Sequence, residues 1–132
     1  EVAMKKLALL VVVLSVFVVS GCSVSPVEKQ WGMADNGIGY VQEFQEVDDE
    51  YGTPIYIFVI SYGGKESEPF RTYDDRFLCL QPGDEVHMRL SNYNSNQGNV
   101  THARYWAYNT KIDAIYGRRI SFGIDFKKWS AP

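Results

Sequence analysis

The chain contains 132 residues, a length that fits one domain of ordinary size. Hydrophobic residues make up 45% of it and charged residues 22%, a balance that excludes both a chain disordered by composition and an all-apolar membrane bundle. The formal net charge of −3 argues against a general nucleic-acid binder, because such proteins normally carry a basic excess. Nucleic acid is therefore not an expected partner.

The N-terminal segment has the composition of an export signal. Lys5 and Lys6 form a positive start, and Leu7–Val19 is a stretch of 13 residues that is apolar except for one serine. Such a stretch is too short to cross about 30 Å of hydrocarbon comfortably as a helix. We therefore expect residues 1–21 to form a signal peptide that is removed. The alternative is a short membrane anchor with a cytoplasmic tail.

The segment ends in Val19-Ser20-Gly21-Cys22. This motif resembles the lipobox of bacterial lipoproteins. The resemblance implies a diacylglyceryl group on the Cys22 thiol, cleavage before Cys22 and acylation of the new amino terminus. Each acyl chain adds about 0.8 kcal/mol per buried CH₂, so two or three chains hold a small domain on a bilayer. Ser23 stands where an aspartate would imply inner-membrane retention. The resemblance thus implies a lipid-anchored outer-membrane protein that faces the periplasm, with residues 22–30 as its lipidated tether.

The remaining residues, 31–132, are expected to form one all-β domain, a small antiparallel β-sandwich or β-barrel. Segments rich in β-branched and aromatic residues alternate with turn residues about every 8–12 positions, and no window has a convincing helical period. Ile55–Ser61 is apolar on both faces, with Ile57 and Val59 on one and Phe58 and Ile60 on the other, which predicts a central strand. Residues 85–91 and 101–109 predict a hairpin joined by an Asn-rich loop over 92–99. Further strands are expected over 40–44, 77–80, 112–116 and 118–126.

The sequence offers little to hold a metal or form a disulfide. If Cys22 is lipidated, Cys79 has no partner in the chain, and the apolar strand expected over 77–80 predicts an inert buried thiol. An intermolecular disulfide and a reactive thiol are the alternatives. A zinc site needs more Cys and His ligands, and Asp48–Glu50 lacks the ligand spacing and glycine of a calcium loop. No metal and no cofactor are expected.

Motifs of enzyme active sites are absent from the sequence, including the nucleophile elbow, the P-loop, the dinucleotide-binding fingerprint and the zinc-protease motif. His87 and His102 lie in the two strands of the predicted hairpin, and simple pairing would bring them together with Glu85 nearby. General acid–base catalysis would also need a defined geometry and a tuned pKa. We expect two solvated histidines, no catalytic residues and a protein that is not an enzyme.

Aromatic and cationic residues gather in the predicted hairpin. Period-two alternation places Val86, Met88 and Leu90 on the core face, so Arg89 lies on the opposite face. Over residues 101–109 the same alternation separates two sets of side chains, with one face carrying His102, Arg104, Trp106 and Tyr108 and the other carrying Ala103, Tyr105 and Ala107. Arginine beside tryptophan and tyrosine is frequent at protein interfaces and can also stack on sugar rings. The alternative is that the aromatic residues pack against a neighbouring sheet. The predicted partner-binding residues are Arg89, Arg104, Trp106 and Tyr108.

Taken together, these features predict a non-enzymatic lipoprotein that is anchored in the outer membrane and binds a protein or glycan partner in the cell envelope. The alternative function is that of an inhibitor or exclusion lipoprotein, either similar to lysozyme inhibitors or of the phage- or plasmid-exclusion type. A hydrolase is less favoured, because the sequence lacks a nucleophile or metal constellation.

Overall fold

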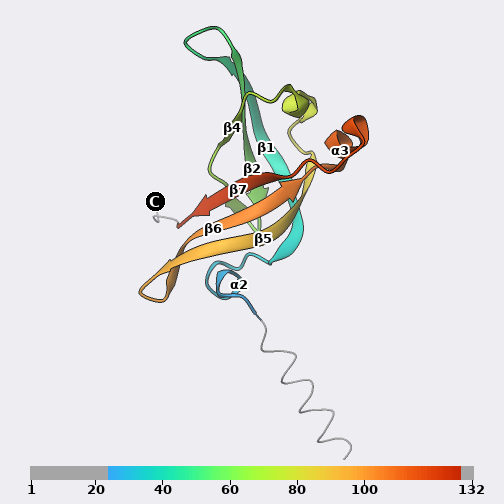
Figure 1. The fold of residues 1–132 in the computed structure, drawn as a ribbon. Coiled ribbons are helices and arrows are strands. Elements are labelled where there is room, and N and C mark those ends of the chain that lie inside the picture. Colours follow the sequence, from blue (N-terminus) through green and yellow to red (C-terminus); the bar gives the residue numbers. More distant parts are fainter. Residues whose placement is uncertain (1–23, 129–132) are drawn as a thin grey trace, which may run out of the picture.

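The computed structural model describes residues 24–128, which form one antiparallel sheet of seven strands (Figure 1). The order across the sheet is β3-β2-β1-β5-β6-β7, and β4 also pairs with β2. The all-β prediction is confirmed. No helix in this range is long and apolar enough to span a bilayer. The strands are β1 (Asn36–Asp48), β2 (Pro54–Tyr62), β3 (Lys65–Glu66), β4 (Phe70–Thr72), β5 (Glu85–Asn96), β6 (Asn99–Tyr108) and β7 (Phe122–Lys127). The helices are α2 (Pro26–Trp31), the 3₁₀ helix η1 (Asp75–Cys79) and α3 (Thr110–Tyr116).

The sheet curls into a half-barrel, and the segment between β3 and β4 bridges its two ends. The backbone N–H of Ser67 donates to the carbonyl of Ile60 in β2 over 2.8 Å. The next N–H, that of Glu68, donates to the carbonyl of Asp125 in β7, also over 2.8 Å. Curling therefore encloses the concave face of the sheet, and the hydrophobic core lies there.

Aromatic side chains fill much of this core. The ring of Phe58 is fully buried, and its centroid lies 5.0, 5.7 and 5.6 Å from those of Phe70, Phe77 and Phe122, respectively. Edge-to-face and tilted pairs at such separations add to the burial of apolar area. Rings from β2, β4, η1 and β7 thus meet at one place in the half-barrel.

Two buried tyrosines share one acceptor at the other end of the core. The hydroxyl groups of Tyr62 and Tyr105 both donate to the carbonyl of Ala34, over 2.8 and 3.0 Å. This arrangement satisfies both phenols, because a carbonyl oxygen has two lone pairs. Burial raises the pKa of both hydroxyl groups, so both remain neutral donors over the ordinary pH range.

The predicted central strand is confirmed. Strand β2 lies between β1 on one side and β3 and β4 on the other. Its side chains alternate as expected, with Phe58 and Ile60 buried on the core face and Ile57 and Val59 half-buried on the other. A strand with neighbours on both sides can be apolar on both faces.

The tether predicted over residues 22–30 is wrong from Pro26 onward, because these residues form helix α2. The Oγ atom of Ser25 accepts the N–H of Glu28, which caps the helix, and Pro26 occupies its first turn. Val27 is fully buried. The side-chain amide of Gln30 also bonds the β5–β6 turn, where it donates to the carbonyl of Gly98 over 3.0 Å.

Two predicted strands are helical instead. Residues 77–80 fall largely within η1, where the carboxylate of Asp74 accepts the N–H of Arg76. Residues 112–116 fall within α3, where the side chain of Asn109 accepts the N–H of Ile112. Each helix has only one or two turns, so a helical period cannot show in the sequence. The polar cap before each helix decides the conformation.

The predicted loop over residues 92–99 is also wrong. Strand β5 continues to Asn96, β6 starts at Asn99, and Gln97 and Gly98 form a two-residue turn with φ of 53° and 79°. Positive φ at both positions is typical of a type I′ hairpin turn. The β5 side chains over residues 91–96 are polar because they are exposed on both faces of the strand, whereas Val100 opposite them on β6 is buried.

Candidate functional site

An open groove of about 920 Å³ lies over β1, β5 and β6, on the face of the sheet opposite to the core. We call it the groove. It receives side chains from the start of β1, from the middle of β5, from the end of β6 and from the segment between α3 and β7. Its lining consists of Asn36, Gly37, Ile38, His87, Met88, Arg89, Leu90, Ser91, Trp106, Tyr108, Arg119 and Ser121. These twelve residues include no aspartate and no glutamate.

The pairing of the strands places the predicted residues next to one another. Arg89 lies opposite Trp106 on one side and opposite Asn36 on the other. Two residues along β5, His87 lies opposite Tyr108. Directly opposite residues on one face of an antiparallel pair are close enough to interact. The groove therefore contains two adjoining rows of side chains that cross the sheet. One row is Asn36, Arg89 and Trp106, and the other includes His87 and Tyr108.

Trp106 is exposed on the outer face, at 48% of its full accessible area. Its neighbours along β6 point the other way, and Tyr105 and Ala107 are fully buried. The alternation predicted for this strand is thus confirmed, and the alternative of a Trp106 packed against a second sheet is wrong. Gly123 lies opposite Trp106 on β7, so no side chain from that position covers the indole.

Tyr108 is held in a stack. The ring of His87 lies parallel to it, with centroids 4.6 Å apart and an angle of 6° between the planes. The guanidinium carbon of Arg119 lies 3.5 Å from the Tyr108 centroid. Both groups cannot occupy the same side of the ring at these distances, so Tyr108 is sandwiched between them. The Nε of Arg119 in turn donates to the carboxylate of Asp113 over 3.1 Å, which fixes the outer member of the stack.

Arg104 lies at the border of the groove rather than in its lining. Its guanidinium carbon is 5.7 Å from the centre of the Trp106 ring, and its Nε is 3.9 Å from a carboxylate oxygen of Asp125. The guanidinium covers Gly123, where a Cβ atom would come within 2.5 Å of Nη2. The glycine therefore makes room for Arg104 beside the exposed indole.

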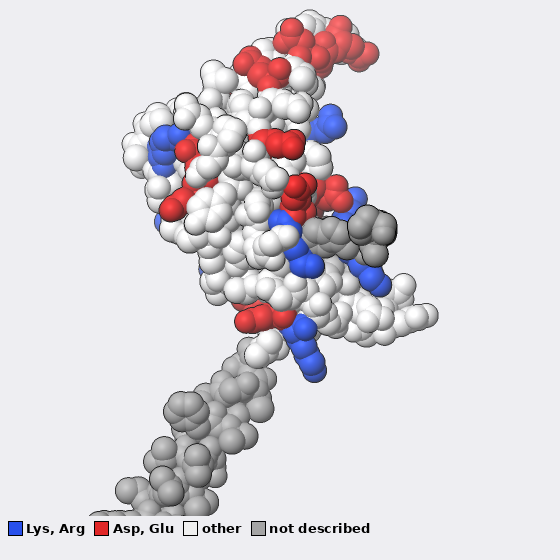
Figure 2. Space-filling view, turned by 180° about the vertical axis from the view of Figure 1, so that it is seen from behind, with Lys and Arg blue, Asp and Glu red and all other residues white. Residues whose placement is uncertain are grey.

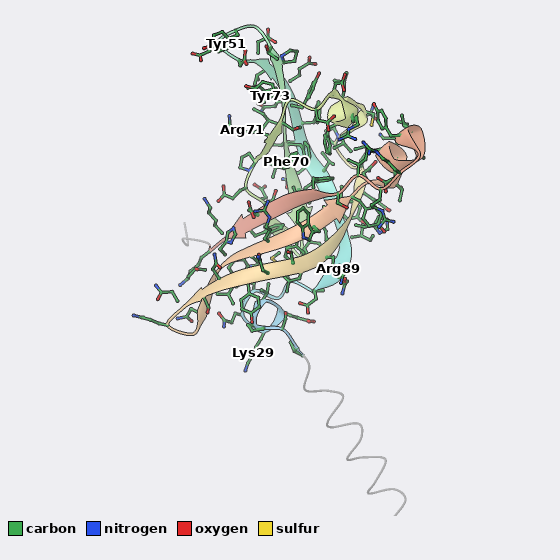
Figure 3. All side chains as sticks on the ribbon, viewed as in Figure 1. Lys29, Tyr51, Phe70, Arg71, Tyr73 and Arg89 are labelled. Carbon is green, nitrogen blue, oxygen red and sulfur yellow. The ribbon has the colours of Figure 1, made fainter. Side chains whose placement is uncertain are left out.

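Arg89 differs from the other two arginines. It is exposed, and no ion pair to it exists within residues 24–128. Figure 3 shows its side chain projecting from the sheet beside β1 and β5. Its guanidinium is thus available to a ligand that enters the groove.

Sequence reasoning found three of the groove residues and missed others. Arg89, Trp106 and Tyr108 all line the groove. Arg119 was missed, because its position over Tyr108 depends on α3, which the sequence pattern does not reveal. Asn36 was missed because it reads as part of a turn, whereas it begins β1.

The two histidines do not form a site. His87 pairs with Tyr108, whereas His102 pairs with Asn94, farther along the hairpin, and its Nε2 lies 3.3 Å from the carboxylate of Asp125. The two imidazoles therefore do not lie together as simple pairing would have placed them. Across the part of the chain that the structure describes, no group of three or more His, Cys, Asp or Glu side chains could hold a metal ion.

The acidic run Asp48–Glu50 lies at the β1–β2 turn, and Cys79 lies at the end of η1. The carboxylate of Asp49 accepts the N–H groups of Tyr51 and Thr53, over 2.8 and 2.9 Å, in the β1–β2 turn. The bond from Thr53 lowers the pKa of this carboxyl. Cys79 is half-buried at the end of η1, not in a strand, and its Sγ lies 3.5 Å from the carbonyl of Arg76. Cys22 lies outside the described residues.

No protein-family model, no curated protein and no solved structure matches this chain.

Proposed function

We propose that this protein is an outer-membrane lipoprotein that binds a protein or glycan partner in the cell envelope through the groove, without catalysing a reaction. One observation carries the proposal. Trp106 is half-exposed, with Arg89 opposite it on β5 and Arg104 near its ring, in a groove whose lining contains no carboxylate. Tryptophan, tyrosine and arginine are the residues that most often dominate binding energy at interfaces.

The groove is also held in place before any partner arrives. The His87–Tyr108–Arg119 stack is fixed through Asp113, and Arg104 rests over Gly123. Side chains that are already ordered lose less conformational entropy when a partner binds. The arrangement therefore supports binding rather than only solvation of an outer sheet face.

The lipid anchor is supported by the lipobox-like motif. Helix α2 begins at Pro26, four residues after Cys22, so an anchor at Cys22 would keep the domain close to the bilayer. Figure 1 places α2 at one end of the domain and the β1–β2 turn at the opposite end. On this proposal the turn points away from the membrane and the groove is at the side.

The anchor is tested by mass spectrometry of the protein extracted from membranes. The proposal expects an N-terminal peptide that begins at Cys22 and carries acyl chains. The Cys22→Ala variant should lose both the acylation and the cleavage before residue 22. An unmodified Cys22, or a Cys22→Ala protein still cut at the same bond, would contradict the anchor.

Binding is tested by crosslinking intact envelopes and recovering the full-length protein with its partners. Trp106→Ala should lose the partner that the wild type captures. Tyr51→Ala is a matched control, because Tyr51 is an aromatic residue that is 84% exposed in the β1–β2 turn, outside the groove. The proposal fails if Trp106→Ala captures the same partner in the same yield as Tyr51→Ala.

A further inference from the structure

We infer that the ligand of the groove is an acidic glycan, a chain of sugar rings that carries carboxylate groups. The inference rests on the proposed function, since it names the ligand class of the same groove. Three properties of the groove lead to this inference. They are the sign of its charge, the hydrogen bonding of the backbone beneath it and the kind of side chains that line it.

The charge of the groove is opposite to that of the protein. The whole chain has a net charge of −3, yet the lining of the groove contains no carboxylate. Arg119 is paired with Asp113 behind the lining, so the positive charge offered to a ligand is that of Arg89, which has no ion pair within residues 24–128. Acidic residues gather elsewhere, most visibly at the end of the β1–β2 hairpin (Figure 2), where Asp48, Asp49 and Glu50 lie. The planar guanidinium of Arg89 is suited to bind a carboxylate through two parallel hydrogen bonds.

The backbone N–H and C=O groups beneath Arg89 and Trp106 already form hydrogen bonds between strands. Strand β5 lies between β1 and β6, and β6 lies between β5 and β7. At Arg89 and Trp106 there is a neighbouring strand on both sides, so the ladder uses the N–H and C=O groups here. An extended peptide binds by adding a strand to a free sheet edge, and β5 and β6 offer no such edge at Arg89 and Trp106. The ligand must be recognised through side chains.

The side chains favour sugar rings over a helical peptide. A helix that binds in a groove needs a row of apolar anchor pockets, whereas Met88 is buried here and Leu90 is half-buried. What the groove exposes is the indole of Trp106 and one aliphatic side chain, Ile38, among polar groups, and a single aliphatic residue does not make such a row. An aromatic face can pack against the C–H groups of a sugar ring, and amides and hydroxyls can bond its hydroxyl groups. The polar groups of this kind are Asn36, Ser91 and Ser121.

Binding of defined oligosaccharides to the purified full-length protein in detergent micelles tests the inference. The probes are a fluorescent oligogalacturonate, a neutral glucose oligomer of the same length and an oligoglutamate of the same charge. We expect the oligogalacturonate to bind at least about tenfold more tightly than either of the others. Its affinity should fall as salt is raised, because exposed guanidinium–carboxylate pairs are screened.

Two matched arginine variants assign the binding to the groove. Arg89→Ala should weaken oligogalacturonate binding about tenfold or more, and Trp106→Ala should do so as well. Arg71→Ala is the control, because Arg71 is exposed on β4, outside the groove, and removes the same charge. Equal affinities of Arg89→Ala and Arg71→Ala would overturn the inference.

The remaining outcomes separate this inference from the proposed function. If the oligoglutamate binds as tightly as the oligogalacturonate, or neither probe binds, the ligand is not an acidic glycan. The proposed function then still stands, provided that Trp106→Ala loses the partner crosslinked in envelopes. If Trp106→Ala keeps that partner, the groove is not the binding site, and the proposed function fails together with the inference.

Discussion

The position of each side chain on β6 decides whether it serves the core or the groove. Tyr105 and Trp106 are sequence neighbours of similar size, but Tyr105 is fully buried whereas Trp106 is 48% exposed. Tyr105 also donates a hydrogen bond to Ala34. The same strand therefore supplies the packing of the half-barrel from one face and the candidate binding surface from the other.

This difference predicts opposite effects of two adjacent alanine substitutions on the free energy of unfolding. Trp106→Ala should change it by less than about 1 kcal/mol, as is usual for surface positions. Tyr105→Ala should lower it by about 3–5 kcal/mol, because it leaves a cavity in the core. Chemical denaturation of both variants measures the two values. If Trp106→Ala destabilises the protein as much as Tyr105→Ala does, Trp106 belongs to the core.

Asp74 is expected to give the protein a pH-dependent contribution to stability. Its carboxylate accepts hydrogen bonds from the Arg76 guanidinium, at 2.8 Å from Nε and 2.6 Å from Nη2, and these bonds hold the pKa of Asp74 below its ordinary value. A carboxyl with a lowered pKa in the folded state stabilises the fold above the pKa of the unfolded chain, about 3.9. That contribution is lost as the pH falls through the folded-state pKa.

The Asp74→Asn variant should therefore have a lower free energy of unfolding than the wild type at pH 7. The difference between the two free energies of unfolding should narrow as the pH falls below about 3.9, where the carboxyl becomes protonated in the unfolded chain, and should narrow further as the pH passes through the lower pKa of the folded state. Urea denaturation over a series of pH values measures this gap. A gap that stays constant down to pH values at which the wild type still folds would contradict the role of the ion pair.

At the scale of whole elements, the sequence predicts a strand correctly where the strand is long and its apolar residues follow a regular pattern. The apolar run of β2 and the alternation in β5 and β6 predicted both the strands and the directions of their side chains. This is why three of the four predicted binding residues line the groove. Helices α2, α3 and η1 have six, seven and five residues, too few to repeat a pattern, so their capping residues and tertiary contacts decide them.

The groove itself could not be derived from the sequence for a related reason. Its lining depends on Asn36 and Arg119, which are 83 positions apart in the chain. Asn36 reaches it through the pairing of β1 with β5, and Arg119 through the turn of chain after α3. Neither long-range pairing nor a short helix leaves a local signal.

Strand β2 should be the element most sensitive to loss of volume on its core face. Phe58→Ala removes a fully buried ring that contacts aromatic residues of four other elements, and it should lower the free energy of unfolding by about 3–5 kcal/mol. Ile57→Ala, on the opposite and half-buried face, should have a smaller effect. Thermal and chemical unfolding of the two variants measure the difference. Equal losses would mean that the outer face of β2 is packed as tightly as the core.

At the scale of the molecule, the fold separates three regions. Helix α2 lies at the end where the proposed anchor would emerge, the acidic β1–β2 turn lies at the far end, and the groove occupies the outer face of β1, β5 and β6. The curled sheet surrounds the core together with buried side chains of α2, η1 and α3, so no second sheet covers its concave side within residues 24–128. The outer face is left for solvent or a partner.

The central claim, that a partner occupies the groove, is tested most directly by photocrosslinking in living cells. A photoreactive phenylalanine analogue is placed at position 38 of the full-length protein in one strain and at position 51 in another, so that Trp106 stays in place in both. Ile38 and Tyr51 are both exposed hydrophobic residues; Ile38 lines the groove and Tyr51 lies outside it. We predict a discrete crosslinked product from position 38 that is missing from position 51. Crosslinks from position 51 alone, or identical products from both positions, would contradict the claim.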